Sequence, residues 1–377
     1  MPELYPLTGP LDPRPRPAGA EPAGPAAAGE ALAGAVPEAA AGPAGPASAG
    51  AGTASAPQLW GASGEVSASR VTVHEVGPRD GLQAEPGVLS TELKIDFCRS
   101  LLAAGVTSLE VASFVHPRLV PQMADAEAVA GALAAQAAST EGSDGRDLRL
   151  LSLVPNLRGL QRALETGVRA VGVFASATES FARANMSTTL QGSVDLACET
   201  ARAAREQGAS VRGYLSMCFG DPWEGPVVRS AVVRASTQLL ESGCAQVVVS
   251  DTIGVAHAGQ IEAVLSDLFD AGVRADQVAL HLHDTYGQAL ANVRTALEAD
   301  IREFDASAGG LGRCPFAPGA TGNLATEDLL WMLHGLGWET GIDLPALAAA
   351  SDAVDRALGR TSASAVKRAL TRTTASG

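Results

Sequence analysis

Long apolar runs, signal sequences and basic clusters are missing from this sequence of 377 residues. No apolar run approaches the roughly 20 residues that a membrane-spanning helix needs, and the N-terminus lacks the basic-then-apolar order of a signal peptide. The net charge of −14, without clustered Lys and Arg, argues against nucleic acid or an anionic membrane as the main partner. An anionic ligand would therefore need local basic groups.

Cysteine is also scarce, and its pattern bears on the compartment. The five cysteines are odd in number, widely spread and free of any CxxC pair. Such thiols are typical of a reducing environment, so we expect a cytoplasmic protein with reduced cysteines. They are Cys98, Cys198, Cys218, Cys244 and Cys314.

Residues 1–69 have almost no aromatic or β-branched residues and are dominated by Ala, Gly and Pro. Such a segment cannot bury enough apolar surface to offset the entropy of ordering, so it is predicted to be a disordered extension. A partner-binding role and a start codon assigned too far upstream are the alternatives. Low Arg content and the presence of acidic residues argue against a mitochondrial transit peptide.

From residue 70 onward, short β-rich runs alternate with longer Ala-, Leu- and Glu-rich stretches. This alternation indicates βα units, and eight such strands predict a closed (β/α)₈ TIM barrel, which takes about 250 residues. We place the domain at 70–377. The predicted strands are Val71–Val76, Ser108–Ala112, Leu148–Val154, Ala170–Ala175, Ser210–Ser216, Gln246–Ser250, Val278–His283 and Glu303–Ser307.

The segments between the strands have the length and spacing of amphipathic helices, for example Ser90–Ala104, Ser193–Gln207 and Tyr286–Ala299. The polar stretch Gln136–Arg146 is predicted to be a loop. From about residue 324 to 377 the pattern is helical, which favours helices packed outside the barrel or in a partner subunit. We expect a homo-oligomer, either a dimer or a tetramer.

Polar and unusual residues follow the predicted strand ends, where TIM-barrel enzymes place their active sites. This position makes several of them candidates for binding or supporting a substrate. Outside the metal site described next, these candidates are Gln83, Ser113, Asn156 and Thr252.

A metal site is predicted from His281 and His283, which are separated by one residue on a strand and therefore point to the same side. Asp80, after the first strand, and Asn323, after the last, can add oxygen ligands because these strands are neighbours in a closed barrel. Two imidazoles and two oxygens with open positions suit Mg²⁺ or Mn²⁺. The alternative for the histidines is a pair of hydrogen-bonded polar side chains.

Arg79 precedes Asp80 and is a candidate for stabilising a developing enolate oxygen. Its alternative is an ion pair that bridges carboxylates in the barrel. Glu110 ends the second strand in an apolar run, so a carboxylate facing the interior must be paired. We interpret Glu110 as a residue that orients Arg79 or a metal ligand.

Cys314 lies in a Gly- and Pro-rich loop between Arg313 and Pro315. A mobile segment of this kind could bring a thiol to the reacting carbon, although an inert thiol is the alternative. The other four cysteines are interpreted as small core residues, with Cys218 also a candidate for the lining of the mouth.

These motifs resemble the 3-hydroxy-3-methylglutaryl-CoA lyases of the wider DRE-TIM metallolyase group. The resemblance runs from about Val71 to Thr361. Its most specific pieces are EVGPRDGLQ at 75–83, SFVHPRLVPQMADAE at 113–127, VRGYLS at 211–216, SDTIGV at 250–255, HLHDTYGQALAN at 281–292 and the stretch from 309 to 328.

The resemblance implies a TIM barrel with added C-terminal helices and a requirement for Mg²⁺ or Mn²⁺. It implies cleavage of an acyl-CoA substrate into acetoacetate and acetyl-CoA, a reaction of leucine degradation and ketone body metabolism. It makes Asp80, His281, His283 and Asn323 the metal ligands, and Glu110 and Glu327 supporting acids.

The implied mechanism is a retro-Claisen cleavage. Asp80 or His281 removes the proton of the tertiary hydroxyl, and Arg79 stabilises the enolate when the C2–C3 bond breaks. Cys314, or a water that it positions, then delivers the proton that completes acetyl-CoA.

Four other functions stay open at this point. A related thioester such as citramalyl-CoA could be the substrate, or the chain could run the condensation forward as an isopropylmalate or homocitrate synthase does. A zinc-dependent barrel hydrolase usually carries its HxH pair after the first strand, whereas here it lies on the seventh. A catalytically inactive metal-binding scaffold is the alternative outside enzymes.

Overall fold

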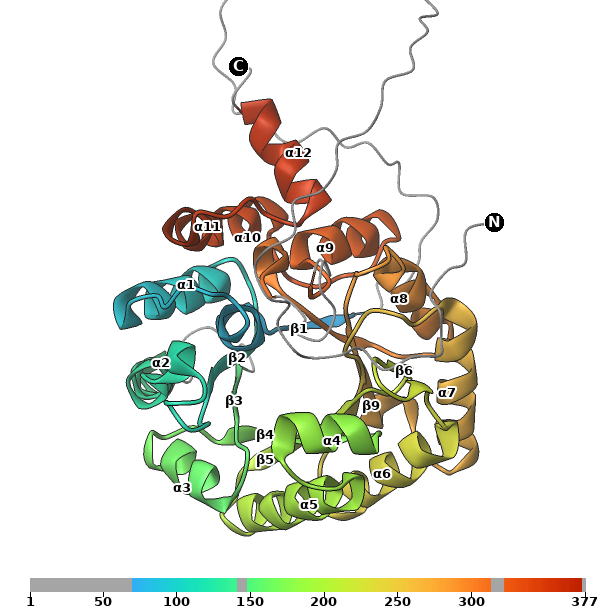
Figure 1. Cartoon of the computed structure of the whole chain (residues 1–377). Helices are drawn as coiled ribbons and strands as arrows, with labels where there is room; N and C mark the ends of the chain where they lie inside the picture. Colours follow the sequence, from blue (N-terminus) through green and yellow to red (C-terminus); the bar gives the residue numbers. More distant parts are fainter. Residues whose placement is uncertain (1–69, 141–147, 313–321, 375–377) are drawn as a thin grey trace, which may run out of the picture. The chain divides into compact units, whose positions relative to one another are not determined.

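The computed structural model describes residues 70–140, 148–312 and 322–374 (Figure 1). The predicted disordered extension at 1–69 lies outside these residues, as does Cys314. Within the described residues, no helix is both long enough and apolar enough to cross a membrane.

Eight parallel strands close into a barrel, which confirms the predicted (β/α)₈ fold (Figure 1). Each predicted strand is present, with ends that differ by no more than one residue. In spatial order the strands are β1 (Thr72–Glu75), β10 (Glu303–Ala306), β9 (Val278–Leu282), β8 (Gln246–Asp251), β5 (Ser210–Ser216), β4 (Ala170–Ser176), β3 (Arg149–Leu153) and β2 (Ser108–Ser113).

The strands form because β-branched and apolar residues can be buried on both faces of a parallel sheet. All six residues of β8 are buried. Side chains pointing inward fill the barrel, and those pointing outward join a larger core beneath the helices. The inner core consists of Leu151, Leu153, Ala170, Tyr214, Val248 and Ala279.

A ring of helices covers the outside of the barrel (Figure 1). The turn after α1 requires a glycine. Gly105 has φ +100°, and a Cβ there would lie 2.2 Å from the carbonyl oxygen of Gly341, so glycine is required. The surrounding helices are α1 (Thr91–Ala103), α2 (Ala126–Thr140), α3 (Leu157–Glu165), α5 (Leu190–Glu206), α6 (Arg229–Glu241), α7 (Ala258–Asp270) and α8 (Ala289–Glu298).

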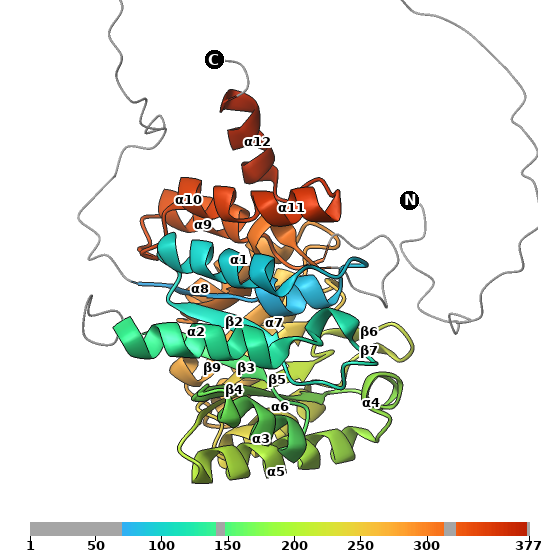
Figure 2. The ribbon, with the colours of Figure 1, turned by 90° about the vertical axis from the view of Figure 1, so that its left-hand side faces the viewer.

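Three local features differ from the sequence-based expectation. The predicted loop at 136–146 was wrong for its first part, because α2 continues through its Ala-rich end to Thr140. The short helix α4 (Glu179–Met186) and the hairpin of β6 (Gly220–Asp221) and β7 (Gly225–Pro226) were not predicted. Figure 2 shows α4 and this hairpin at the same end of the barrel.

The C-terminal helices lie on the side of the barrel where α1 and α8 are, and α12 is the outermost of them (Figures 1 and 2). Buried Lys367 joins two of these helices because its ammonium group donates to Ser351 Oγ and to Asp355 Oδ2, at 2.5 and 2.8 Å. These helices are α9 (Thr326–Gly335), α10 (Leu344–Ala350), α11 (Asp352–Leu358) and α12 (Ala365–Thr374).

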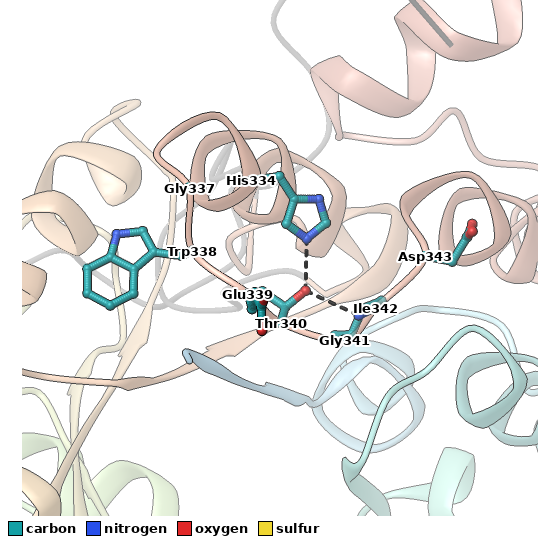
Figure 3. A pocket seen from close by; sticks show the side chains of 8 residues that line it. All are labelled: His334, Gly337, Trp338, Glu339, Thr340, Gly341, Ile342 and Asp343. Atoms are coloured by element: carbon teal, nitrogen blue, oxygen red, sulfur yellow. Dashed lines mark hydrogen bonds between the residues drawn. The ribbon is translucent and has the colours of Figure 1, made fainter. Parts of the chain in front are cut away.

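A surface pocket lies between α9 and α10, among residues 334–343 (Figure 3). His334 Nε2 lies 2.9 Å from Thr340 Oγ1, which also accepts a hydrogen bond from the backbone N–H of Ile342. Glu339 pairs with Arg70, just before β1, so this pocket lies at the N-terminal end of the barrel strands. None of the predicted site residues lines it.

Candidate metal centre

The predicted metal ligands converge at the C-terminal end of the barrel. Asp80 lies in the π-turn after β1, and His281 lies on β9. His283 follows β9 and forms a backbone bridge with Asn323, which brings the loop after β10 to the same place. Ligand atoms of Asp80, His281 and His283 all lie within 4.8 Å of one another. The prediction that β1 and β10 are neighbours is confirmed, which explains this convergence.

The contacts among these four side chains fit a divalent cation. Asn323 Nδ2 donates to Asp80 Oδ2 at 2.8 Å and to the carbonyl oxygen of Leu311 at 3.2 Å, which leaves Asn323 Oδ1 buried without a partner. His283 Nδ1 is also buried without a partner. Buried polar atoms nearly always have a hydrogen-bond partner. Buried oxygen and nitrogen atoms without a partner, beside a carboxylate, are the ligand atoms that a divalent cation would use.

Close backbone packing fixes Asn323. Gly312 has φ +110°, and a Cβ there would lie 2.6 Å from Asn323 Nδ2. Any larger residue would therefore displace the amide that contacts Asp80. The described part of the chain offers no second group of three metal-ligating side chains.

Arg79 lies between two carboxylates. Its Nε donates to Glu110 Oε2 at 2.7 Å, Nη2 lies 2.6 Å from the same oxygen, and Nη1 donates to Asp80 Oδ1 at 2.6 Å. Burial raises the pKa of Glu110 to about 7, against the opposing effect of Arg79. Burial also raises the pKa of Asp80, but Arg79 and His281 outweigh it and lower the pKa to about 2. The site therefore holds an anionic Asp80 beside a fixed guanidinium group.

His281 has a buried carboxylate behind it that the sequence-based reasoning missed. Its Nδ1 lies 3.1 Å from Asp305 Oδ2, and its Nε2 lies 4.0 Å from Asp80 Oδ2. Burial lowers the pKa of His281, but the hydrogen bond and charge of Asp305 outweigh this and raise it overall. The signal in the sequence was the alternation Glu303, Asp305 on β10, which places both charges on the same side of the strand.

The other predicted binding residues differ in their surroundings. Ser113 Oγ and Gln83 Oε1 are buried without hydrogen-bond partners. Asn156 caps α3, where its Oδ1 accepts from the N–H of Gly159 at 3.0 Å. Thr252 Oγ1 accepts from the N–H of Met217, whose φ is +60°. Asn156 and Thr252 therefore have structural partners, and binding of substrate by any of the four stays a prediction.

Glu327 supports the turn after β10. Both of its carboxylate oxygens lie 2.9 Å from the N–H of Gly309, in a turn where Gly309 has φ +68°. Burial raises the pKa of Glu327 to about 8. These contacts fix the backbone at Gly309, which precedes Cys314 in the sequence. Cys314 itself lies outside the described residues. The other four cysteines are buried.

Glu75 is a second buried carboxylate that the sequence-based reasoning missed. It lies at the end of β1, fully buried, and ties this strand to the loop after β10. Oε1 accepts from the N–H groups of Gly77 and Ala308 at 2.8 and 2.9 Å, and Oε2 accepts from Thr326 Oγ1 at 2.6 Å. Burial raises its pKa from 4.5 to about 7, against these hydrogen bonds.

This shift predicts a pH-dependent contribution to stability. A carboxyl group with a raised pKa in the folded state loses stabilisation as the unfolded chain ionises, so the free energy of unfolding should fall by about 3 kcal/mol between pH 4.5 and 7. In Glu75→Gln the amide oxygen can accept both N–H groups, and no titration remains. Urea denaturation in EDTA at pH 5 and pH 8 measures the change.

The difference in free energy of unfolding between the original chain and Glu75→Gln reports mainly on Glu75, because the two chains differ at this position alone. The pKa of Glu327 is raised first of all by its own burial, to which the charge of Glu75 adds. We expect the original chain to lose stability relative to Glu75→Gln as the pH rises. A difference that stays constant from pH 5 to pH 8 would show that Glu75 titrates normally in the folded protein.

Comparison with known proteins adds the family. The HMGL-like family model matches residues 70–354. The mitochondrial hydroxymethylglutaryl-CoA lyase of Arabidopsis thaliana is 43% identical over 294 residues, which are 78% of this chain and 61% of that protein. The cytoplasmic 3-hydroxy-3-methylglutaryl-CoA lyase of Danio rerio is 44% identical over 294 residues, 78% of this chain and 85% of that protein.

A solved structure has the same architecture. It is an HMG-CoA lyase from Acinetobacter baumannii in complex with coenzyme A and 3-methylmalate, with 35% sequence identity and a TM-score of 0.72. The likeness covers 80% of this chain and 95% of that one. Because the family model spans the barrel and the candidate metal centre, the chain belongs to the HMGL-like family.

Proposed function

We propose that this protein is a hydroxymethylglutaryl-CoA lyase that cleaves 3-hydroxy-3-methylglutaryl-CoA into acetoacetate and acetyl-CoA. The observation that carries the proposal is the cluster of Asp80, His281, His283 and Asn323 beside Arg79, in a chain of the HMGL-like family. Family membership supports the carbon–carbon lyase class. The cluster supports the metal dependence of the reaction.

The metal ligands in this proposal are Asp80 Oδ2, the His281 and His283 imidazoles and Asn323 Oδ1. A divalent cation held there would supply Lewis-acid polarisation of the hydroxyl and carboxylate oxygens of the substrate. The mixed nitrogen and oxygen set favours Mg²⁺ or Mn²⁺.

Different side chains around this site transfer the protons and stabilise the developing charge. Asp80 takes the proton of the tertiary hydroxyl, because an imidazole of His281 that binds the cation through one nitrogen and donates to Asp305 from the other has no lone pair left for it. As the C2–C3 bond breaks, its electron pair moves onto the thioester, and Arg79 stabilises the enolate oxygen. Glu110 keeps Arg79 in place through two contacts to one carboxylate oxygen. Cys314, or a water that it positions, supplies the proton to C2 and completes acetyl-CoA.

The partner of the site is an acyl-CoA thioester. The Acinetobacter baumannii structure holds coenzyme A, which supports a thioester of this class. We further propose a homo-oligomer in the cytoplasm. The named relatives include cytoplasmic and mitochondrial forms, so a fractionation experiment decides the compartment.

A substrate panel tests the proposal. The purified chain is incubated with Mg²⁺ or Mn²⁺ and, separately, with 3-hydroxy-3-methylglutaryl-CoA and citramalyl-CoA, while acetyl-CoA release is followed. We expect the highest kcat/KM with 3-hydroxy-3-methylglutaryl-CoA and loss of activity in EDTA. A preference for citramalyl-CoA, or acetyl-CoA consumption with a 2-oxo acid, would replace this assignment by a related lyase or a condensing synthase.

A further inference from the structure

A buried Arg212–Asp305–His281 chain lies behind the metal centre. Asp305 and His281 are paired in register on the neighbouring strands β10 and β9, so their side chains lie side by side and both point into the barrel. The distance from Asp305 Oδ2 to His281 Nδ1 is 3.1 Å, and Asp305 is 1% exposed. Asp305 therefore contacts the imidazole on the side that faces away from Asp80.

Arg212 fixes Asp305 in turn. Its Nη1 lies 2.7 Å from Asp305 Oδ1, and its Nη2 lies 3.0 Å from Glu303 Oε1. The guanidinium group is buried and also donates to Gln246 Oε1 and Tyr214 Oη, both at 3.0 Å. Arg212 therefore supplies, at contact distance, the positive charge that Asp305 needs to remain an anion in the interior.

This arrangement selects one tautomer of His281. A carboxylate accepts hydrogen bonds and cannot donate them, so Nδ1 of His281 must carry the proton that it donates to Asp305. Nε2 then keeps its lone pair and faces Asp80 Oδ2 at 4.0 Å. Only an imidazole nitrogen that carries no proton can bind a metal. The tautomer therefore decides whether Nε2 of His281 can act as a ligand.

We infer that Asp305 is a positioning residue, which holds His281 with Nε2 directed at the proposed cation, and that Arg212 secures Asp305 in this role. The inference rests on the proposed metal site and extends it inward by two residues. Asp305 touches neither the substrate nor the cation in this assignment.

The substitution Asp305→Asn tests the inference with little change in shape. Arg212 only donates, so the amide oxygen stays on Arg212 and the NH₂ group turns toward His281 Nδ1. That forces the proton onto Nε2, which then cannot bind metal. We expect the Kd for Mn²⁺, measured from free Mn²⁺ by electron paramagnetic resonance, to rise about 10- to 100-fold. Added Mn²⁺ should recover part of the lost turnover.

Glu303→Gln is the matched control. Glu303 lies on the same strand and pairs with the same Arg212, but its ion pairs lead to Arg149 and Arg212 and not to His281. We expect Mn²⁺ affinity to stay unchanged in this variant. Equal Mn²⁺ affinity in Asp305→Asn and Glu303→Gln would overturn the inference.

If Asp305→Asn does not fold, because Arg212 loses its buried counter-charge, the double variant Asp305→Leu with Arg212→Met removes both charges together. Weakened Mn²⁺ binding in the folded double variant supports the inference, and unweakened binding overturns it. The two proposals fail differently. If the original chain binds no Mn²⁺, the proposed metal site is wrong. If it binds Mn²⁺ and the Asp305 variants bind equally well, only the role of Asp305 is wrong.

Discussion

Replacing His281 with alanine should lower kcat for cleavage of 3-hydroxy-3-methylglutaryl-CoA by about 10³-fold or more, since Lewis-acid stabilisation is worth several kcal/mol. His281 connects the site on both sides, to Asp80 at 4.0 Å and to Asp305 at 3.1 Å. Its loss removes one of two nitrogen ligands and leaves Asp305 facing a cavity. Acetyl-CoA release at saturating Mn²⁺ measures the effect.

His334→Ala is the control for this substitution. His334 lies on α9, and the described hydrogen bond of its ring goes to Thr340 in the pocket at the other end of the barrel (Figure 3). We expect normal kcat in His334→Ala and a native circular dichroism spectrum in both variants. A folded His281→Ala protein that keeps its turnover would remove His281 from the site.

Replacing Arg79 with lysine should lower kcat by about 10²- to 10³-fold, the usual effect of losing one fixed donor to a developing oxyanion. Lysine keeps the charge but cannot contact both Glu110 and Asp80 in the planar fork that arginine makes. The ammonium group would therefore lie at one carboxylate and away from the enolate oxygen. Steady-state kinetics give kcat and KM for this variant.

Arg162→Lys is the matched control, because Arg162 also contacts one glutamate through Nε and Nη2, at 2.7 and 2.6 Å. Its partner Glu127 lies on the outer helix α2, and the other hydrogen bonds of Arg162 go to the carbonyl oxygens of Phe114 and Val115, so none of these contacts reaches a proposed metal ligand. We expect normal kcat in Arg162→Lys and normal Mn²⁺ affinity in Arg79→Lys. A normal kcat in Arg79→Lys would mean that Arg79 only bridges two carboxylates.

Most of the fold could be predicted because the barrel repeats one simple pattern. Each barrel strand is a short, largely buried run, and five helices between strands (α1, α3, α5, α6 and α7) are followed two residues later by a glycine such as Gly105, so the alternation is visible without any tertiary information. The error at Gln136–Thr140 came from treating polar residues as a loop signal, although the Ala-rich context continues α2. Helix ends depend on packing and are the least predictable part.

The site could be predicted in part, for a geometric reason. The HxH spacing places His281 and His283 together, and closure of the barrel brings Asp80 and Asn323 to them. Asp305 was not found because its importance depends on the register between β9 and β10, which periodicity alone does not reveal. Glu75 was missed for a similar reason, since its partners at Ala308 and Thr326 lie more than two hundred residues away along the chain.

The cation between these side chains is best tested by diffraction from crystals soaked in MnCl₂, with anomalous data collected near the manganese edge. We expect one strong peak in contact with Asp80 Oδ2, Asn323 Oδ1 and a nitrogen of each histidine, at about 2.0 to 2.3 Å. A difference map without a peak among these four groups would contradict the metal-dependent cleavage proposed for this protein.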